Sequence, residues 1–247
     1  PCRPITTTFP PRLHHGLEEG VEVCGIKSYE YALPAETSEE QLMELIDTLN
    51  ADAKVNGILV QLPLPKHLNE EAVIARISPL KDVDAFSASN VGKIMIGNYA
   101  FLPCTPAGCM ELIHSTGVDV SGKECVVIGR SNIVGKPMAM LLLHENGTVT
   151  ICHSRTKNLK EVCQRADILV AAVGRPGFVT GDMVKPGAVV IDVGINRNSE
   201  GKLCGDVAYA EVEPIVDAIT PVPGGVGSVT TSVLVGHVVE AAKRKYM

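Results

Sequence analysis

Residues 129–135 (GRSNIVG) place two glycines between an apolar run and a helix-like run. Glycine allows a tight turn, and a helix N-terminus offers unpaired backbone N–H groups and a partial positive charge to a pyrophosphate. The spacing departs from the common Gly-x-Gly-x-x-Gly, because Ser131 replaces the middle glycine and the last glycine comes one place late. The segment indicates a dinucleotide site, with an ordinary strand-to-helix turn as the alternative.

The next apolar run, residues 148–152, indicates which dinucleotide would bind. An NAD-preferring site usually has Asp or Glu at the end of this strand, where the carboxylate accepts from a ribose hydroxyl. Here Ser154 and Arg155 follow, and no acid is present. Hydroxyl and guanidinium groups suit a 2′-phosphate, and Arg130 supplies a second cation. The sequence therefore favours NADP over NAD, with a solvated basic turn as the alternative.

Three further positions have side chains or backbone suited to binding. Gln61 ends the apolar run 57–60, where α/β sheets place ligands, although a satisfied buried amide is the alternative. Asp84 is a carboxylate that accepts from two donors at once, or else a helix or turn cap. Gly224 and Gly225 precede the last helix and either admit a flat ligand close to the backbone or form a plain turn.

The elements that would position these residues alternate between short apolar strands and helices. Strands are expected at 57–60, 124–128, 148–152, 167–172 and 188–193. Helices are expected from a Ser38 cap through Leu49, near 69–77, from Thr105 with Pro106 at the first helical position, near 137–144, near 158–165 and over 230–245. The alternation implies right-handed crossovers and a parallel sheet, so the fold class is α/β. Residues 1–23 show no helical or alternating period, and no strand is expected there.

Composition excludes several classes of protein. The 247 residues include 45% hydrophobic and 20% charged residues, with a net charge of −6 and a pI near 5.7. The absence of a basic block argues against nucleic acid or an anionic membrane as the main partner, and no apolar run reaches the roughly 20 residues that span a bilayer. The N-terminus lacks the apolar core of a signal peptide, so a cytoplasmic protein is expected.

The eight cysteines do not indicate a metal site. None forms a Cys-x-x-Cys pair, and none has a His partner at zinc-ligand spacing. Cys125 and Cys152 lie inside apolar runs, where they are expected to be small buried hydrophobes.

Five segments together resemble a known family. They are residues 57–65 (GILVQLPLP), 81–86 (KDVDAF), 103–106 (PCTP), 192–196 (DVGIN) and 221–227 (PVPGGVG). In this order they resemble the bifunctional methylenetetrahydrofolate dehydrogenase/cyclohydrolase family, from about Cys24 to the C-terminus.

The resemblance implies a two-domain, homodimeric enzyme of one-carbon metabolism and purine biosynthesis. A folate domain would span residues 1–108 and 229–247, and a Rossmann-like NADP domain would span 109–228, with tetrahydrofolate bound between them. The family passes a hydride from methylenetetrahydrofolate to NADP and then hydrolyses methenyltetrahydrofolate to formyltetrahydrofolate. The segments at 57–65 and 221–227 argue against the alternative that the chain is another Rossmann-type dehydrogenase.

The resemblance also implies roles for individual residues. Gln61 matches the glutamine that hydrogen-bonds the catalytic lysine, and Asp84 matches the aspartate that holds the pterin. Further substrate contacts are implied for Val60, Leu62, Pro223, Gly224, Gly225, Val226 and Gly227. Nucleotide contacts are implied for Gly129, Arg130, Ser131, Ser154 and Ile195.

The first 23 residues depart from the family. Its catalytic lysine and accompanying tyrosine would fall at Leu17 and Leu13, and no Lys or Tyr precedes Lys27. The family's first strand is also expected to be missing, and a shifted reading frame or a fragment joined near residue 23 would explain both. Loss of a general base should reduce water addition more than hydride transfer. A catalytically impaired folate- or NADP-binding protein is therefore the alternative, with His14 or His15 as replacement bases less favoured.

Smaller departures lie near the candidate folate residues. Ala85 stands where the family usually has Gly, Ser87 replaces its usual His, and Ser228 and Val229 replace its usual Pro-Met. A methyl group on Ala85 is expected to lie beside Asp84.

Overall fold

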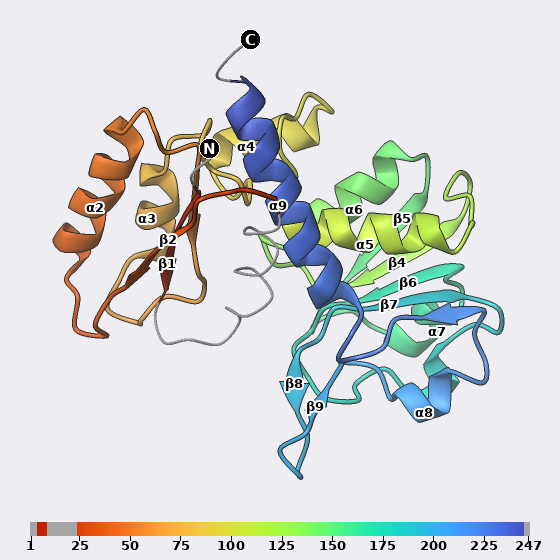
Figure 1. Cartoon of the computed structure of the whole chain (residues 1–247). Helices are drawn as coiled ribbons and strands as arrows, with labels where there is room; N and C mark the ends of the chain where they lie inside the picture. The colour runs from red at the N-terminus through yellow and green to blue at the C-terminus, as the bar shows by residue number, and fades with distance from the viewer. Residues whose placement is uncertain (1–3, 9–23, 245–247) are drawn as a thin grey trace. The chain divides into compact units, whose positions relative to one another are not determined.

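A computed structural model of the chain describes the backbone of residues 4–8 and the whole of residues 24–244. The chain divides into two compact units, both of α/β type (Figure 1). Unit 1 comprises Pro1–Leu102 and Thr231–Met247, and unit 2 comprises Pro103–Thr230. Over the described residues, no helix combines the length and the apolar character needed to cross a membrane.

The sheet of unit 1 has three parallel strands in the order β2-β1-β3. They are β1 (Pro4–Thr8), β2 (Tyr29–Ala32) and β3 (Gly57–Val60). In the central strand, Ile5 pairs with Tyr29 on one side and with Ile58 on the other. The expectation that no strand lies in the first 23 residues is therefore wrong. A central parallel strand needs no polar alternation, and Pro4 at its first position costs little pairing.

Two helices cover one face of this sheet. Helix α2 (Glu39–Ala51) begins with the expected capping box, in which Ser38 Oγ accepts from the Gln41 N–H at 3.2 Å and Gln41 Oε1 accepts from the Ser38 N–H at 3.0 Å. Helix α3 (Glu70–Arg76) lies beside α2. Their shared core consists of Leu42, Ile46, Leu49, Val55, Ile58, Val60, Leu68, Val73 and Ile77. The buried side chains fix how β3 faces the helices.

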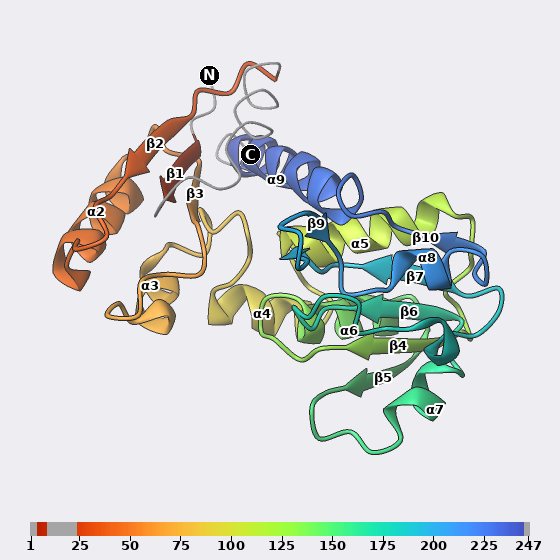
Figure 2. The same ribbon diagram turned by 90° about the horizontal axis from the view of Figure 1, so that it is seen from below.

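The sheet of unit 2 has five parallel strands in the order β10-β7-β6-β4-β5 (Figure 2). They are β4 (Glu124–Ile128), β5 (Thr148–Cys152), β6 (Ile168–Ala171), β7 (Val189–Asp192) and β10 (Ala218–Ile219). The chain runs outward from β4 to β5 and then returns to β6 on the other side of β4. The order therefore reverses between β4 and β6, which is where open parallel sheets bind ligands. The expected Rossmann-like sheet is confirmed.

Helices lie on both faces of this sheet (Figure 1). Helices α5 (Cys104–Ser115) and α6 (Gly135–His144) pack on one face, and α7 (Leu159–Cys163) and α8 (Tyr209–Val212) pack on the other. Cys125 and Cys152 are fully buried, as the sequence predicts. Burial also raises the pKa of Cys163 to about 12, so this thiol stays protonated.

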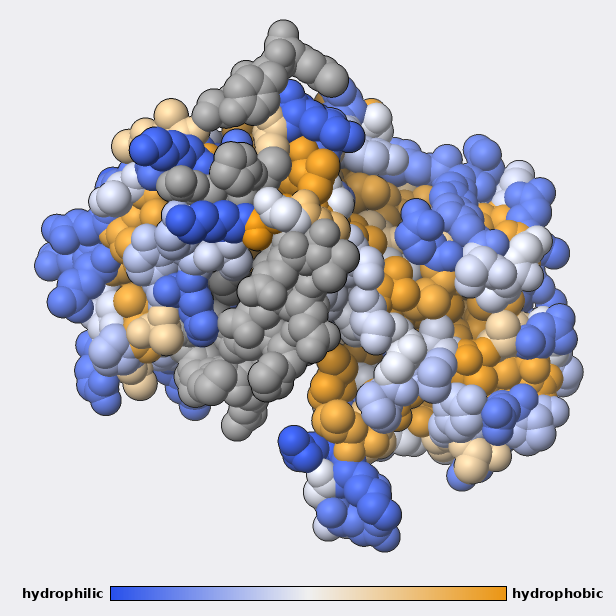
Figure 3. All heavy atoms as spheres, viewed as in Figure 1, coloured by the Kyte–Doolittle hydropathy of each residue, from blue (hydrophilic) through white to orange (hydrophobic). Residues whose placement is uncertain are grey.

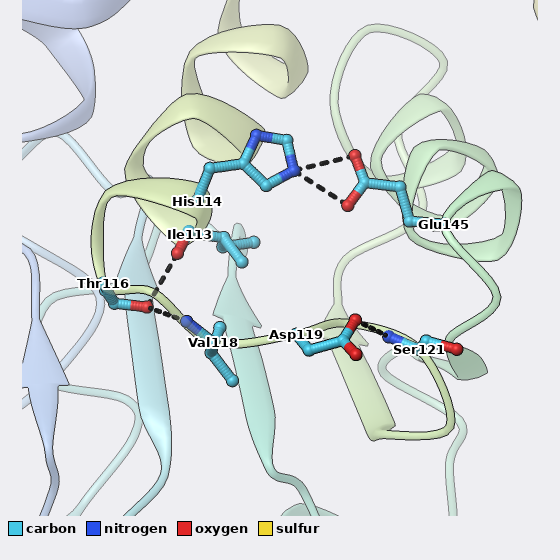
Figure 4. Close-up of polar contacts among 7 residues, drawn as sticks. All are labelled: Ile113, His114, Thr116, Val118, Asp119, Ser121 and Glu145. Carbon is cyan, nitrogen blue, oxygen red and sulfur yellow. Dashed lines mark hydrogen bonds and ion pairs between the residues drawn. The ribbon is translucent and has the colours of Figure 1, made fainter.

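The ends of α5 and α6 are joined at the surface of unit 2. His114, in the last turn of α5, places Nε2 2.8 Å from both carboxylate oxygens of Glu145, which caps the C-terminus of α6 (Figure 4). Thr116 Oγ1 donates to the Ile113 carbonyl and Asp119 accepts from the Ser121 N–H in the connection that leads to β4. The imidazole–carboxylate contact is about half exposed, so it contributes little to stability.

Several short elements follow the main strands of unit 2. After β7, strands β8 (Asn196–Arg197) and β9 (Leu203–Cys204) form a hairpin whose tip is hydrophilic (Figure 3). The 3₁₀ helix η1 (Gly181–Met183) lies beside α7. In unit 1, helix α4 (Ala88–Met95) follows β3 and α3, and it is a helix that the sequence pattern does not predict.

Two expected helix starts were wrong. Helix α5 begins at Cys104, so Pro106 is its third residue, where the missing N–H loses no intrahelical bond. Helix α9 (Val226–Arg244) begins four residues before the expected Thr230. The turn that Gly224 and Gly225 suggest ends at Gly225, and the helix starts at the next residue. Residues from Thr231 onward belong to unit 1.

Candidate nucleotide and folate sites

The glycine turn joins β4 to α6 at the switch point of the sheet. Gly129 has φ +136°, and a Cβ there would lie 2.3 Å from the carbonyl oxygen of Ala172. A Cβ on Gly135 would lie 2.3 Å from the carbonyl oxygen of Gly129. Both positions therefore require glycine, because the strand, the turn and the helix meet through their backbones.

Ser131 stabilises this turn from inside. Its Oγ accepts from the N–H groups of Val134 at 3.1 Å and Gly135 at 3.3 Å. A nucleotide contact is expected for Ser131 from the sequence, whereas this capping role becomes visible only in the fold. A hydroxyl has one donor besides its two acceptor lone pairs, so Ser131 can cap the helix and donate to a phosphate at once.

The end of β5 lies directly beside the turn. The Gly129 N–H donates to the carbonyl of Cys152 at 2.9 Å, which fixes the two segments at one edge of the sheet. His153 Nδ1 accepts from the Arg155 N–H at 3.1 Å, so the loop folds back on itself. Ser154 and Arg155 are exposed on this loop. The structure thus brings Arg130, Ser131 and Ser154 to the same edge.

This edge has the charge that a 2′-phosphate requires. Residues 129–137 and 152–158 contain no Asp or Glu, while Arg130, Lys136 and Arg155 are all exposed there. The backbone of the glycine turn lies at this edge of the sheet, and the three cationic side chains lie in the turn and in the loop beside it. The residues present therefore fit a dinucleotide with an additional phosphate.

Ile195 lies at the same edge of the sheet, after β7. It is 61% exposed, which is unusual for isoleucine, while Gly194 just before it is buried. The Gly194 N–H donates to Asp192 Oδ1 at 3.0 Å. An exposed apolar side chain held by an anchored backbone is suited to contact an apolar ligand surface.

Asp192 and Asp206 are buried carboxylates that the sequence analysis did not assign to the site. Asp192 is 3% exposed and Asp206 is fully buried. Burial raises the pKa of Asp192, although three backbone N–H groups donate to its carboxylate. In a sequence, the signal would have been an acid that ends an apolar strand and a second acid that follows a glycine 13 residues further on.

The first candidate folate residues lie at the end of β3. Val60 is 6% exposed, and Gln61 and Leu62 are half-buried. Gln61 Nε2 donates to the carbonyl of its neighbour Leu62 at 3.2 Å. This local contact of the amide nitrogen fixes the orientation of the Gln61 side chain at the carboxyl end of the strand.

Asp84 follows a segment that runs beside β3. The Ile58 N–H donates to the Lys81 carbonyl at 2.7 Å, and Ile58 forms a parallel bridge with Asp82. The segment therefore advances in the same direction as β3, and Asp84 comes two residues after this bridge. Unit 1 places Asp84 and the end of β3 in neighbouring segments.

Asp82 holds the turn that follows Asp84. It is 2% exposed, and its carboxylate accepts from the Phe86 N–H at 3.2 Å, the Ser87 N–H at 2.8 Å and Asn90 Nδ2 at 2.9 Å. Ser87 in turn caps α4. Asp82, two residues before Asp84, is therefore a structural support for that loop, a role that no sequence motif indicated.

Ala85 occupies a conformation that favours glycine. Its φ is +56° and it is fully buried. A non-glycine residue in the left-handed region costs about 1 kcal/mol. The departure from glycine noted in the sequence therefore stores strain beside Asp84.

The remaining candidate residues begin α9. Pro223 and Gly224 are exposed, while Gly225 is buried, with no room for a Cβ because it would lie 2.5 Å from the Pro221 carbonyl. Val226 and Gly227 form the first turn of the helix. These residues belong to unit 2, whereas Val60, Gln61, Leu62 and Asp84 belong to unit 1. Leu13, His14, His15 and Leu17 lie outside the described residues.

Comparisons with known proteins identify the family of both units. Residues 16–84 match the family model for the tetrahydrofolate dehydrogenase/cyclohydrolase catalytic domain, and residues 103–246 match its NAD(P)-binding domain. The chain is 66% identical over 219 residues to the bifunctional protein FolD of Acetivibrio thermocellus, covering 89% of this chain and 77% of that protein.

The chain belongs to the tetrahydrofolate dehydrogenase/cyclohydrolase family.

Solved structures of the family agree with this assignment. The bifunctional enzyme FolD of Campylobacter jejuni superposes with a TM-score of 0.92 at 43% identity, covering 98% of this chain and 88% of that chain. The FolD of Trypanosoma brucei, solved with NADP cofactor and inhibitor, superposes with a TM-score of 0.94 at 36% identity, covering 99% and 88%. The resemblance drawn from the five sequence segments is confirmed.

Proposed function

We propose that this chain oxidises methylenetetrahydrofolate to methenyltetrahydrofolate with NADP and hydrolyses methenyltetrahydrofolate to formyltetrahydrofolate. The observation that carries the proposal is the acid-free basic edge at the switch point of unit 2, in a chain that matches both domains of the family. NADP, when bound, supplies the hydride acceptor. The chain's own residues bind and orient both ligands.

In unit 2, the cofactor residues are Gly129, Arg130, Ser131, Ser154 and Ile195. The two glycines of the turn admit the pyrophosphate to the backbone, and the Ser131 hydroxyl donates to it while it caps α6. Arg130 and Ser154 receive the 2′-phosphate at the edge formed by β4 and β5. Ile195 gives an apolar contact on the opposite side of the switch point.

In unit 1, Asp84 binds the pterin. Its carboxylate accepts from two adjacent N–H groups of the amino-pyrimidinone edge, a bidentate arrangement that recognises this ring. Gln61 takes the place of the family's glutamine that hydrogen-bonds the catalytic lysine, and Val60 and Leu62 flank the substrate. The loop of Pro223, Gly224, Gly225, Val226 and Gly227 lies beside the folate.

The proposal includes a homodimer formed through unit 2 in the cytoplasm, with no nucleic-acid or membrane partner. The net charge of −6 argues against nucleic acid or an anionic membrane as a partner. Strand β5 is one of the two edge strands of the five-stranded sheet in the described part of unit 2, and Ile151 on it is 37% exposed. Light scattering on the purified protein would give the oligomeric state.

Absorbance of methenyltetrahydrofolate tests the activity. The purified chain with methylenetetrahydrofolate and NADP should produce the methenyl compound. Methenyltetrahydrofolate supplied without NADP should then decay faster with the enzyme than without it. Absence of formation, in a protein that still binds NADPH, would overturn the proposal and leave a binding protein without dehydrogenase activity.

A further inference from the structure

Asp206 is the most fully hydrogen-bonded carboxylate at the nucleotide edge among the described residues. It is completely buried, in contact with the loop that follows β6 and with Asn196 of the β8–β9 hairpin. Oδ2 accepts from the N–H groups of Val173 at 2.6 Å and Gly174 at 3.0 Å. Oδ1 accepts from the Arg175 N–H at 2.8 Å and from Asn196 Nδ2 at 2.8 Å. The four donors use the four lone-pair directions of an ionised carboxylate.

These donors belong to two loops of the candidate nucleotide site. Residues 173–175 follow β6, and Asn196 follows the loop after β7. Since β6 and β7 are adjacent parallel strands, both loops leave the sheet at the edge where the glycine turn lies. The loop after β6 also adjoins that turn, because Ala172 is the residue that excludes a Cβ from Gly129. One carboxylate therefore joins the two loops.

The position of Asp206 is itself fixed by Asp192. The N–H of Asp206 donates to Asp192 Oδ1 at 2.8 Å, and the N–H of Val207 donates to Asp192 Oδ2 at 2.9 Å. Close approach is possible because glycines stand opposite both carboxylates. A Cβ on Gly194 would lie 2.4 Å from Asp206 Cγ, and a Cβ on Gly205 would lie 1.8 Å from Asp192 Oδ2. The two aspartates and two glycines form one preorganised support.

The donor set requires an acceptor on both oxygens. All four donors are backbone or amide N–H groups, and an asparagine at 206 would direct an NH₂ group at some of them. At least one loop would then lose its contact and an N–H group would be left without its acceptor. Loss of hydrogen bonds to a buried charged group is costly, so the loops would shift rather than tolerate it.

The geometry points to Asp206 as a positioning residue for the nicotinamide half of NADP, acting through the loops at 173–175 and 194–196. This inference rests on the proposed function. Arg130 and Ser154 lie on the β4–β5 side of the switch point, which takes the 2′-phosphate end. A dinucleotide that crosses the switch point places its other half over β6 and β7, where Asp206 holds the backbone.

Binding of NADPH to the Asp206→Asn variant tests this inference without relying on turnover. Isothermal titration should show a Kd raised about tenfold or more, as expected for lost charged hydrogen bonds. In the dehydrogenase assay, kcat should fall and the KM for NADP should rise, while the KM for methylenetetrahydrofolate stays unchanged. The preference for NADP over NAD should also stay unchanged, because the residues that would receive the 2′-phosphate lie on the other side of the switch point.

Two further variants make the test decisive. Asn196→Ala removes one of the four donors and keeps Asp206, so its NADPH Kd should rise about twofold to fivefold even if Asp206→Asn does not fold. Asp167→Asn weakens a carboxylate at the opposite end of β6, where it accepts from the Glu124 N–H and Lys185. This control should lose stability without a change in NADPH Kd.

The outcomes separate the inference from the proposed function. An unchanged NADPH Kd in folded Asp206→Asn, or an unchanged Kd in Asn196→Ala, would overturn the inference. An equal rise in the KM for both substrates would also overturn it, since that pattern reports a general structural role. If the unmodified chain lacks dehydrogenase activity, the proposed function fails, and the NADPH titrations still decide the role of Asp206.

Discussion

His237 on α9 contacts the carbonyl oxygen of Val83 through Nδ1 at 2.9 Å, across 154 residues of sequence. A carbonyl only accepts, so Nδ1 carries the proton. Burial lowers the pKa of His237 by more than the hydrogen bond to Val83 raises it, and the nearby Arg244 guanidinium lowers it further. The ring is therefore neutral at pH 7. Because Val83 precedes Asp84, a neutral imidazole on the last helix fixes the backbone of the candidate folate loop.

The first prediction concerns stability and pH. The pKa of His237 is lower in the folded chain than the ordinary value of about 6.5 in the unfolded chain. Its contribution to stability is complete above pH 6.5 and declines as the pH falls towards the folded pKa, because the unfolded chain binds the proton first. Urea unfolding between pH 7.5 and 5.5 should show a shallower loss for His237→Gln than for the unmodified chain. The exposed His144, changed to Gln, serves as the control, and an unchanged slope in His237→Gln would contradict the assignment.

The second prediction concerns Asp84. Asp84→Ala should abolish binding of methylenetetrahydrofolate and leave NADPH binding intact, because we propose that this carboxylate of unit 1 accepts from the pterin. Titration with each ligand measures this separately. Glu44→Gln, an exposed change on α2 of the same unit, should leave both affinities as they are. Equal loss of both ligands in Asp84→Ala would mean that Asp84 is structural.

The third prediction concerns Asp82. Asp82→Ala should lower the free energy of unfolding by about 3 kcal/mol, because three N–H groups lose a buried charged acceptor. It should also raise the KM for the folate substrate, since the turn after Asp84 loses its support. Asp52→Ala removes an exposed carboxylate that accepts from the Lys54 N–H and should cost less than about 1 kcal/mol. Similar losses in the two variants would show that the Asp82 contacts contribute little.

The fourth prediction concerns cofactor choice. Arg130→Ala should weaken NADP binding more than NAD binding, because only NADP presents a 2′-phosphate to the guanidinium. The ratio of kcat/KM for the two cofactors measures the effect, which should shrink at high salt. Arg165→Ala, an exposed cation of the same unit, is the control. An unchanged ratio in Arg130→Ala would show that Arg130 does not contact the 2′-phosphate.

The fifth prediction concerns the balance between the two activities. The resemblance puts the family's lysine position at Leu17, where no base stands, and a general base contributes about 10²–10⁴ to a rate. Ring opening of methenyltetrahydrofolate, relative to hydride transfer, should therefore be slower here than in the Acetivibrio thermocellus relative measured in parallel. Equal ratios in the two proteins would show that another group performs the proton transfer.

Most of the unit 2 sheet could be predicted because its strands are continuous apolar runs bounded by helices. Strand β1 could not, since its partners are β2 and β3, which lie more than 20 residues away, and a central parallel strand needs no alternation. The two-residue strands β8, β9 and β10 are too short to leave a periodic pattern.

The places of the candidate residues in the fold could be predicted where those residues follow strand ends. Arg130 and Ser154 follow strands of the unit 2 sheet, and Gln61 follows a strand of the unit 1 sheet. Within each parallel sheet, the strand ends meet at one edge. The residues that hold the site loops in place, Asp206 and His237, could not be predicted from strand ends. Asp206 accepts from backbone groups 31 to 33 residues earlier, and His237 contacts a carbonyl 154 residues earlier. Only tertiary folding joins these partners.

The division of the chain has a consequence for its synthesis. Unit 1 is built from residues on both sides of unit 2, since Thr231–Met247 belong with Pro1–Leu102. On the ribosome, the strands of unit 2 leave the exit tunnel before His237 can reach Val83. The first segment of unit 1 is therefore synthesised before unit 2 and its last segment after unit 2. Unit 2 can fold while unit 1 still lacks α9.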